Sequence, residues 1–406
     1  MPELKRRLAP LLSSLTLAAS LLLLGACASG PAELSTAQKL LDTKLAEDPQ
    51  FQSYALSIMA DSDATHARSA RLAAITAGGR AATSAAIPSL DPQDAEELAA
   101  LEGLFAGRGV LKMQAAARLA DGANAEALEW LASQMGKGGT VLPATAMNAL
   151  AATERSEDVR QALRGMIWSK ELSTRNEGYE ILGQIEQPWA VDLLLEGLDK
   201  EFAEDRVGPI AALGAQGDPR AVKPVLKWIQ TQGLVEASLD TLARLGDPSA
   251  ATKIAPLLQN EQPIVRVFAA SALWRLGDGG AAQETLGVLV DSEEASVRQA
   301  VATELGKVTE PQAISWLTKL ATDADPDVRI EALRALVAAP ASVDSALLVQ
   351  AAGDESYEVA TLALNGLAEV GSAEQAAELA PLLENSNPYI AISAAHAILS
   401  IHGGKE

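Results

Sequence analysis

Residues 264–322 read IVRVFAASALWRLGDGGAAQETLGVLVDSEEASVRQAVATELGKVTEPQAISWLTKLAT, in which one pattern occurs twice. An apolar residue followed by Arg opens an Ala-rich helix, and Leu stands eight residues after that apolar residue. A turn of Gly, Asp or Pro then leads to a second amphipathic helix. The two copies open at Val265 and Val297, 32 residues apart. A repeat of about 20–50 residues is typical of a solenoid, so this stretch predicts stacked two-helix units.

The same pattern continues on both sides of this stretch, with spacings of 29–32 residues between openers. The residue eight positions after each opener is aliphatic in every unit. The openers are Leu111, Leu142, Thr174, Asp205, Leu234, Val265, Val297, Val328, Val359 and Ile390. We therefore expect an all-α, right-handed α-α superhelix of about ten two-helix repeats.

The composition agrees with closely packed helices. The chain has 406 residues, 48% of them hydrophobic and only 3% aromatic. Ala and Leu, which favour helices, must therefore fill the core. The formal net charge of −21 makes binding to nucleic acid improbable, because phosphates would be repelled. One cysteine permits no intramolecular disulfide.

The turns carry a family resemblance. The segments LGDPSAA at 245–251 and GAQGDPRAV at 214–222 place Asp before Pro at the start of a helix, where Asp caps free amides and Pro lacks an amide to leave unpaired. They resemble the HEAT-like repeats first associated with phycobilin lyases. The resemblance covers residues 107–403 and implies a HEAT/armadillo-like solenoid. It says little about function, because this repeat serves many unrelated binding roles.

The N-terminus has the pattern of a secretory signal peptide. Lys5, Arg6 and Arg7 precede an apolar run over residues 8–24, and Leu-Gly-Ala-Cys ends the segment at Cys27. This ending resembles the lipobox of bacterial lipoproteins, which implies cleavage after residue 26 and lipid on Cys27, including a fatty acyl chain such as palmitate. Ala28 favours the periplasmic face of the outer membrane over the inner membrane. The alternative is an uncleaved membrane anchor, for which 17 residues with four hydroxyl side chains are marginal.

Residues 27–35 are expected to form a lipidated tether. Residues 36–106 have a helical composition but stand out of register with the repeats, with helices near 36–47, 50–60, 64–77 and 93–106. We expect an irregular helical cap, which solenoids need to cover their first exposed face. A separate small module is the alternative.

Aromatic positions on the second helices suggest a binding surface. Projection at 100° per residue puts Trp130, Trp168, Trp228 and Trp316 on the side opposite the buried stripe. Since the second helices of HEAT-like solenoids line the concave surface, these residues are candidates for partner binding, with Leu193 and Leu347 extending the apolar track. The alternative is that the indole rings fold back and fill gaps between helices.

Two polar columns have structural interpretations. Arg175, Arg206, Arg266, Arg298 and Arg329 each follow an opener and are expected to pair with acidic turn residues. A second column, expected to form turns or helix caps, consists of Asn260, Asp291, Asp323, Asp354 and Asn385. The series Asp323, Asp325 and Asp327 lacks the Gly and Glu of an EF-hand calcium loop, so no metal site is predicted.

The expected function is a lipid-anchored, periplasm-facing scaffold whose concave groove holds a protein or an extended peptide. No cofactor is expected, and the chain is not expected to be an enzyme, because it lacks GxSxG, P-loop and HExxH motifs. Two alternatives remain: a lipoprotein that binds cell-wall carbohydrate through the same aromatic residues, and a lyase-like enzyme or subunit.

Overall fold

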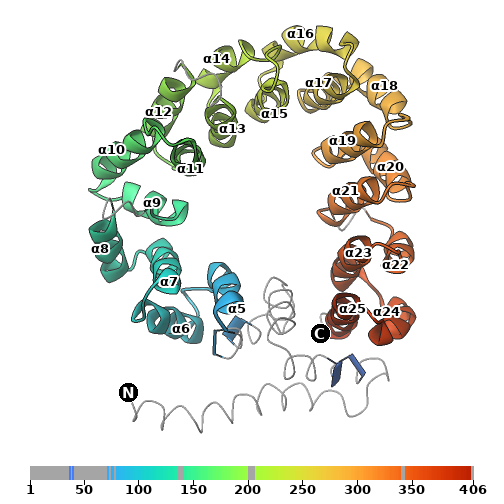
Figure 1. Ribbon diagram of the computed structural model, residues 1–406, viewed down its shortest axis with the longest axis horizontal. Coiled ribbons are helices and arrows are strands. Elements are labelled where there is room, and N and C mark those ends of the chain that lie inside the picture. The colour runs from blue at the N-terminus through green and yellow to red at the C-terminus, as the bar shows by residue number, and fades with distance from the viewer. Residues whose placement is uncertain are drawn as a thin grey trace. The chain divides into compact units, whose positions relative to one another are not determined.

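The computed structural model describes residues 36–37, 39–40, 71–72, 75–76, 79–135, 141–199, 206–339 and 343–403. Every element with defined bounds in these ranges is helical, as the sequence predicts (Figure 1). The chain divides into one unit formed by Leu101–Ala335 and another formed by Met1–Ala100 with Leu336–Glu406. The expected signal peptide, the tether, Cys27 and most of the three helices placed before residue 78 lie outside the described residues.

The unit Leu101–Ala335 is a series of helix pairs. Its first helices are α7 (Val110–Asp121), α9 (Ala144–Ala151), α11 (Leu172–Leu182), α13 (Val207–Gln216), α15 (Val235–Leu245), α17 (Pro263–Arg275), α19 (Ala295–Leu305) and α21 (Pro326–Val337, which ends just beyond the unit). Its second helices are α8 (Ala125–Gln134), α10 (Ser156–Ile167), α12 (Pro188–Leu198), η4 with α14 (Pro219–Ala221, Val222–Leu226), η5, α16 and η6 (Pro248–Ala250, Ala251–Ile254, Ala255–Gln259), α18 (Gly279–Leu289) and α20 (Pro311–Leu320). Helix α6 (Ala95–Phe105) crosses the boundary at residue 100.

The two sets of helices form two layers, and the first helices form the inner one (Figure 1). This corrects the expectation that second helices line the concave surface. Each first helix from α7 to α17 packs on the first helix of the next repeat, whereas neighbouring second helices, such as α10 and α12, contact each other less. Small residues such as Ala269, Ala270 and Ala272 let the first helices approach closely, so this layer takes the shorter side of the curve.

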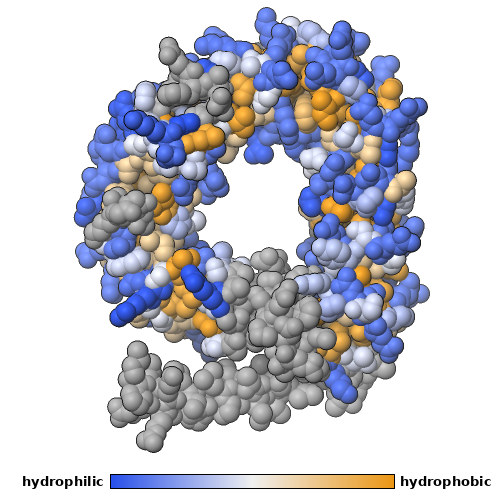
Figure 2. All heavy atoms as spheres, in the orientation of Figure 1, coloured by the Kyte–Doolittle hydropathy of each residue, from blue (hydrophilic) through white to orange (hydrophobic). Residues whose placement is uncertain are grey.

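The core lies between the layers. The aliphatic residue eight positions after the opener is buried in all ten repeats: Leu119, Leu150, Leu182, Leu213, Leu242, Leu273, Leu305, Leu336, Leu367 and Ile398. Figure 2 shows apolar residues gathered between the layers and hydrophilic residues toward the edges. The largest fully buried side chain is Tyr179 of α11. It fits because Gly197 and Gly208 face its ring, and a Cβ atom at either glycine would lie 2.6 or 2.8 Å from ring carbons.

The predicted turn chemistry is confirmed at two repeats. The side chains of Asp218 and Asp247 accept hydrogen bonds from the amides of Arg220 and Ser249, two residues on. A glycine with positive φ ends the preceding helix in each case, at Gly217 (68°) and Gly246 (67°), a conformation that favours glycine. Asp278 and Glu310 stand at the same position in the next two repeats, and their side chains make no capping hydrogen bond.

The second unit contains α5 (Gly79–Ala86), η1 (Ile87–Ser89), α22 (Ser345–Ala352), α23 (Tyr357–Val370), α24 (Ala373–Leu379), η8 (Ala380–Glu384) and α25 (Pro388–Gly403). Helix α23 packs on α22 and α25. A capping box formed by Ser372 and Gln375 starts α24. Across the parts of the chain that the structure describes, no helix combines the length and apolarity needed to cross a bilayer.

Candidate functional site

A charged network joins three consecutive repeats of the inner layer. Asp240 of α15 accepts hydrogen bonds from Arg275 of α17 (Nη1 to Oδ1, 2.8 Å), from Lys307 just after α19 (Nζ to Oδ1, 3.1 Å) and from Arg244 (Nε to Oδ2, 2.8 Å). Lys307 also pairs with Glu304 at 2.7 Å, and the Glu304 side chain is only 4% exposed. Because α17 separates α15 from α19, the Lys307–Asp240 contact reaches past a whole repeat.

The network shifts the pKa values of its members. Burial alone would raise the pKa of Asp240, but the hydrogen bond from Arg275 and the charge of Lys307 outweigh burial and lower that pKa from 3.8 to about 2. Burial would lower the pKa of Lys307, yet the charge of Glu304 and its hydrogen bond raise it above 10.5. Both groups therefore stay ionised over the whole physiological pH range.

Sequence reasoning missed this network, although the sequence contains a signal for it. Arg244, Arg275 and Lys307 each stand ten residues after the opener, in three successive repeats. A basic residue there lies at the C-terminal end of the first helix, where the helix dipole favours positive charge. The carboxylates that complete the network stand six and seven residues after their openers, and only the packing of three repeats brings them together.

Four of the arginines that follow the openers bind backbone carbonyl oxygens, a contact that the sequence analysis did not predict. Arg175, Arg266, Arg298 and Arg329 each donate from Nη1 to the carbonyl oxygens six and five residues earlier, at 2.8–3.3 Å. They thereby satisfy carbonyls of the turn between repeats. Arg298 also makes the expected acidic pairing, with Asp323 at 2.7 Å; that hydrogen bond raises the pKa of Arg298 and lowers that of Asp323.

The predicted turn column is confirmed, with one residue displaced. Asn260, Asp323, Asp354 and Asn385 each accept a hydrogen bond from the amide two residues on. In the repeat that opens at Val297, Ser292 accepts this hydrogen bond from the amide of Glu294 in place of the expected Asp291. Asp291 instead pairs with Lys319 of α20. The extra residue in this 32-residue spacing moves the turn by one position.

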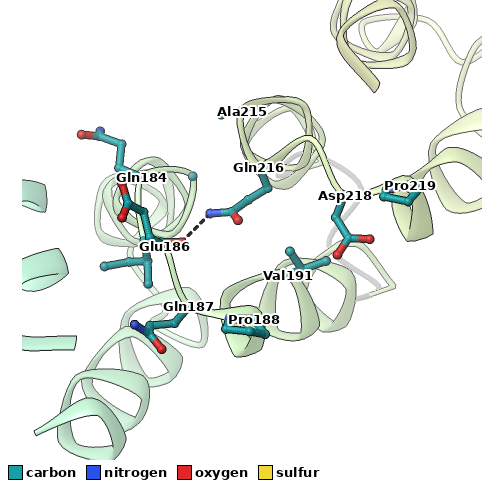
Figure 3. Close-up of a pocket in the computed structure, with 11 residues that line it drawn as sticks. Gln184, Glu186, Gln187, Pro188, Val191, Ala215, Gln216, Asp218 and Pro219 are labelled. Carbon is teal, nitrogen blue, oxygen red and sulfur yellow. Dashed lines mark hydrogen bonds between the residues drawn. The ribbon is translucent and has the colours of Figure 1, made fainter. Parts of the chain in front are cut away.

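A cleft opens between two neighbouring loops of the same unit (Figure 3). Its volume is about 690 Å³, and its lining residues are Gly183, Gln184, Ile185, Glu186, Gln187, Pro188, Val191, Ala215, Gln216, Asp218 and Pro219. Gln216 points across it from α13 and donates from Nε2 to the carbonyls of Leu182 (2.7 Å) and Ile185 (2.8 Å). Asp218 is held by Arg220. These bonds hold adjacent repeats together, so the cleft is a polar seam between two repeats.

The predicted tryptophans do not form one surface. Trp168 at the end of α10 is 51% exposed, but Trp130, Trp228 and Trp316 are half-buried. Trp130 packs edge-on against Phe105 with centroids 5.7 Å apart, and Lys112 lies 4.8 Å from both rings. Trp130, Trp228 and Trp316 therefore fit the alternative interpretation, in which the indole rings fill gaps between helices.

The other two half-buried indoles also have protein partners. Arg206 stacks over Trp228 at 4.3 Å. Trp316 packs edge-on against the buried Trp274 at 6.0 Å.

The two predicted leucines lie in different environments. Leu193 is 1% exposed, so its assignment to an exposed apolar track is wrong. Its helix α12 packs against α10, α11 and α13, and these neighbours bury more than one face of it. Leu347 of α22 is half-buried and belongs to the other unit. Among the residues with described placement, no three His, Cys, Asp or Glu side chains form a group that could hold a metal ion.

Comparison with known proteins supports the repeat assignment. Residues 252–337 match the family described as HEAT repeats. The chain is 31% identical over 143 residues to the bilin biosynthesis protein PecE of Nostoc sp. (strain PCC 7120), an alignment that takes in 34% of the chain and 56% of that relative. The chain thus spans little more than half the length of this relative.

Two solved structures match the chain at low identity. The complex of CpcE and CpcF of phycocyanin lyase from Nostoc sp. PCC 7120 is 21% identical, with 65% of the chain and 97% of that structure covered and a TM-score of 0.42. Human deoxyhypusine hydroxylase in complex with glycerol is 16% identical, with 61% and 97% covered and a TM-score of 0.31.

The similarity to a bilin biosynthesis protein corrects one expectation. From the absence of known catalytic motifs we expected that the chain is not an enzyme. The match to PecE, a bilin biosynthesis protein, contradicts this expectation. The absence of known motifs was a weak argument, because a fold that serves many unrelated roles does not by itself indicate or exclude an activity.

Proposed function

We propose that this chain is a lipid-anchored solenoid that holds a protein partner against its first-helix layer and works as a subunit of a lyase-type assembly. The observation that carries the proposal is the network around Asp240. It ties α15, α17 and α19 to one another, so the inner surface that they form is fixed before a partner arrives. A preorganised surface binds more tightly because little conformational entropy is lost on binding.

The lyase part of the proposal rests on the similarity to PecE. A protein that attaches or processes a bilin on another protein must recognise that protein, which a curved solenoid surface suits. By this reasoning the partner is an acceptor protein and the small molecule is a linear tetrapyrrole. This replaces the expectation of a scaffold without activity.

The address of the protein is proposed from its sequence. The Leu-Gly-Ala-Cys segment supports lipid attachment at Cys27, and Ala28 supports the periplasmic face of the outer membrane. Several acyl chains would hold the protein firmly, since each buried methylene contributes about 0.8 kcal/mol. Mass spectrometry of the mature N-terminus tests the anchor: an unmodified Cys27 would refute it.

Site-specific photo-crosslinking in living cells tests the partner surface. Ala211 and Thr303 are exposed residues six positions after their openers, equivalent to Asp240, and would carry a photoreactive amino acid. Val288 on the outer helix α18 is 71% exposed and serves as the matched control. We expect the same protein to be captured from both inner positions and not from Val288. Capture from Val288 alone would place the partner on the other layer and refute the proposal.

A separate measurement tests the lyase part. The purified protein, with and without the captured partner, is mixed with phycocyanobilin and with biliverdin, and the absorbance of the bilin is followed. A shifted spectrum that survives denaturation on the partner protein would demonstrate attachment. An unchanged spectrum for both bilins, with the partner present, would rule out bilin chemistry.

A further inference from the structure

One surface position differs between repeats in a way that the fold does not require. Where the structure describes it, the residue six positions before the opener stands at or just after the end of the preceding helix. In seven of the ten repeats it is polar or glycine: Gly136, Asp199, Gln259, Asp291, Thr322, Gly353 and Glu384. The remaining three repeats have Phe105, Trp168 and Trp228, and Phe105 packs edge-on against Trp130. Since polar residues or glycine occupy this turn in seven repeats, the turn itself does not require an aromatic ring.

Trp168 and Trp228 differ in how far they are exposed. The guanidinium of Arg206 lies over the ring of Trp228 at 4.3 Å, and Trp228 is half-buried. Trp168 is 51% exposed, which for so large an apolar side chain is unusual on a protein surface. A large part of the Trp168 indole is therefore accessible to a ligand.

The surroundings of Trp168 are open and polar. A shallow depression of about 480 Å³ is lined by Gln161, Arg164, Gly165 and Trp168. A Cβ atom at Gly165 would meet nothing within 4 Å, so the floor of the depression is open. Arg164 donates one hydrogen bond to Glu196 of α12 (Nη2 to Oε1, 2.9 Å), and both side chains reach solvent.

The side chains near Trp168 indicate which class of ligand could bind there. A protein-binding hot spot places its tryptophan in a dry, tightly packed centre. This ring shares an open depression with an amide and a guanidinium, and the guanidinium pairs with the carboxylate of Glu196. A pyranose ring has a flat face of C–H groups that packs on an indole, and hydroxyls that both donate and accept hydrogen bonds. Arg164 can donate, Glu196 can accept, and the Gln161 amide can do both.

We propose that Trp168, with Gln161, Arg164 and Glu196, is a stacking site for a hexopyranose unit of a glycan. The site is on α10 and α12 of the second-helix layer, apart from the first-helix surface proposed for a protein partner. It therefore goes beyond the proposed function, and either proposal can fail without the other.

Calorimetry with soluble hexasaccharides tests the site. The full-length protein is titrated with N-acetylglucosamine hexamer, cellohexaose and maltohexaose at millimolar concentrations. We expect at least one to bind, Trp168→Ala to weaken binding at least about tenfold, and Trp168→Phe to retain part of it. Trp228→Ala is the matched control and should bind as the wild type does. Unfolding midpoints of all variants verify that they are folded.

Two results would overturn the site. One is the absence of heat with all three sugars, and the other is binding that Trp168→Ala leaves unchanged. The protein-partner proposal is read out separately, since Trp168→Ala should leave photo-crosslinking from Ala211 unaltered. Loss of that crosslink in a folded Trp168→Ala variant would mark Trp168 as a protein contact and overturn the glycan site.

Discussion

Lys307 and Asp240 lie 3.1 Å apart, although 67 residues and one whole repeat separate them. In a solenoid most contacts join neighbouring repeats, so a bond that passes over a repeat limits how far three first helices can separate. Arg275, from the repeat in between, binds the same carboxylate oxygen at 2.8 Å. Asp240 therefore acts as the common acceptor that sets the spacing of α15, α17 and α19.

Removing the charge of Asp240 should weaken the unit markedly. Asp240→Asn leaves the partly buried cations of Arg275 and Lys307 without their main carboxylate, and we expect a loss of about 2–3 kcal/mol in the free energy of unfolding. Urea unfolding measures it. The control is Asp192→Asn, whose exposed pair with Arg220 should contribute less than about 0.5 kcal/mol. Equal losses in the two variants would mean that the network is not structural.

The same group predicts a stability change in acid. The folded pKa of Asp240 is about 2, below the ordinary value of 3.8. A lowered pKa stabilises the fold above the unfolded pKa, and this stability disappears as the pH falls from about 4 through about 2. The shift corresponds to roughly 2 kcal/mol. Unfolding of wild type and Asp240→Asn between pH 5 and about pH 2 should show the difference between them shrinking over that window. A constant difference would contradict the assigned pKa.

The sequence predicts the repeat and its core well, because both depend on local periodicity. The ten aliphatic residues eight positions after each opener are all buried. The predicted surface failed at Leu193, because a single-helix projection does not include the neighbours that pack on several sides of α12. The sequence analysis also assigned the second helices to the inner layer, whereas the first helices form it. Which layer is the inner one depends on how closely whole helices approach each other, and a single helix does not show this. The Asp240 network could not be derived, because it joins residues up to 67 positions apart.

The close packing of Gly197 against the Tyr179 ring predicts that adding one methyl group there lowers the stability of the protein. In Gly197→Ala the new Cβ would lie 2.6 Å from ring carbon Cε1 and 2.8 Å from the hydroxyl oxygen, so helix α12 or the ring must move. We expect a loss of about 1–3 kcal/mol. The control Gly165→Ala meets nothing within 4 Å and should be neutral or stabilising by up to about 1 kcal/mol, because glycine is a poor helix former.

A double variant isolates this contact. If the ring causes the loss, Gly197→Ala should cost less when Tyr179 is replaced by Leu, whose side chain is shorter. The coupling free energy from the four unfolding measurements gives the answer. Additive losses would mean that Gly197 is required for another reason, such as the conformation of α12.

Replacing each tryptophan by alanine should distinguish buried from exposed positions by the loss in the free energy of unfolding. Trp274 is 4% exposed, and Trp274→Ala should cost about 3–5 kcal/mol. Trp316 packs on Trp274 and lies close to Gly287, so Trp316→Ala should cost an intermediate amount, about 2 kcal/mol. Trp168→Ala removes a ring that is 51% exposed and should change stability by less than about 1 kcal/mol. Thermal unfolding of the three variants measures these losses and ranks them. A loss for Trp168→Ala as large as that for Trp274→Ala would show that Trp168 is needed for packing, and it would remove the reason for assigning a binding role to this position.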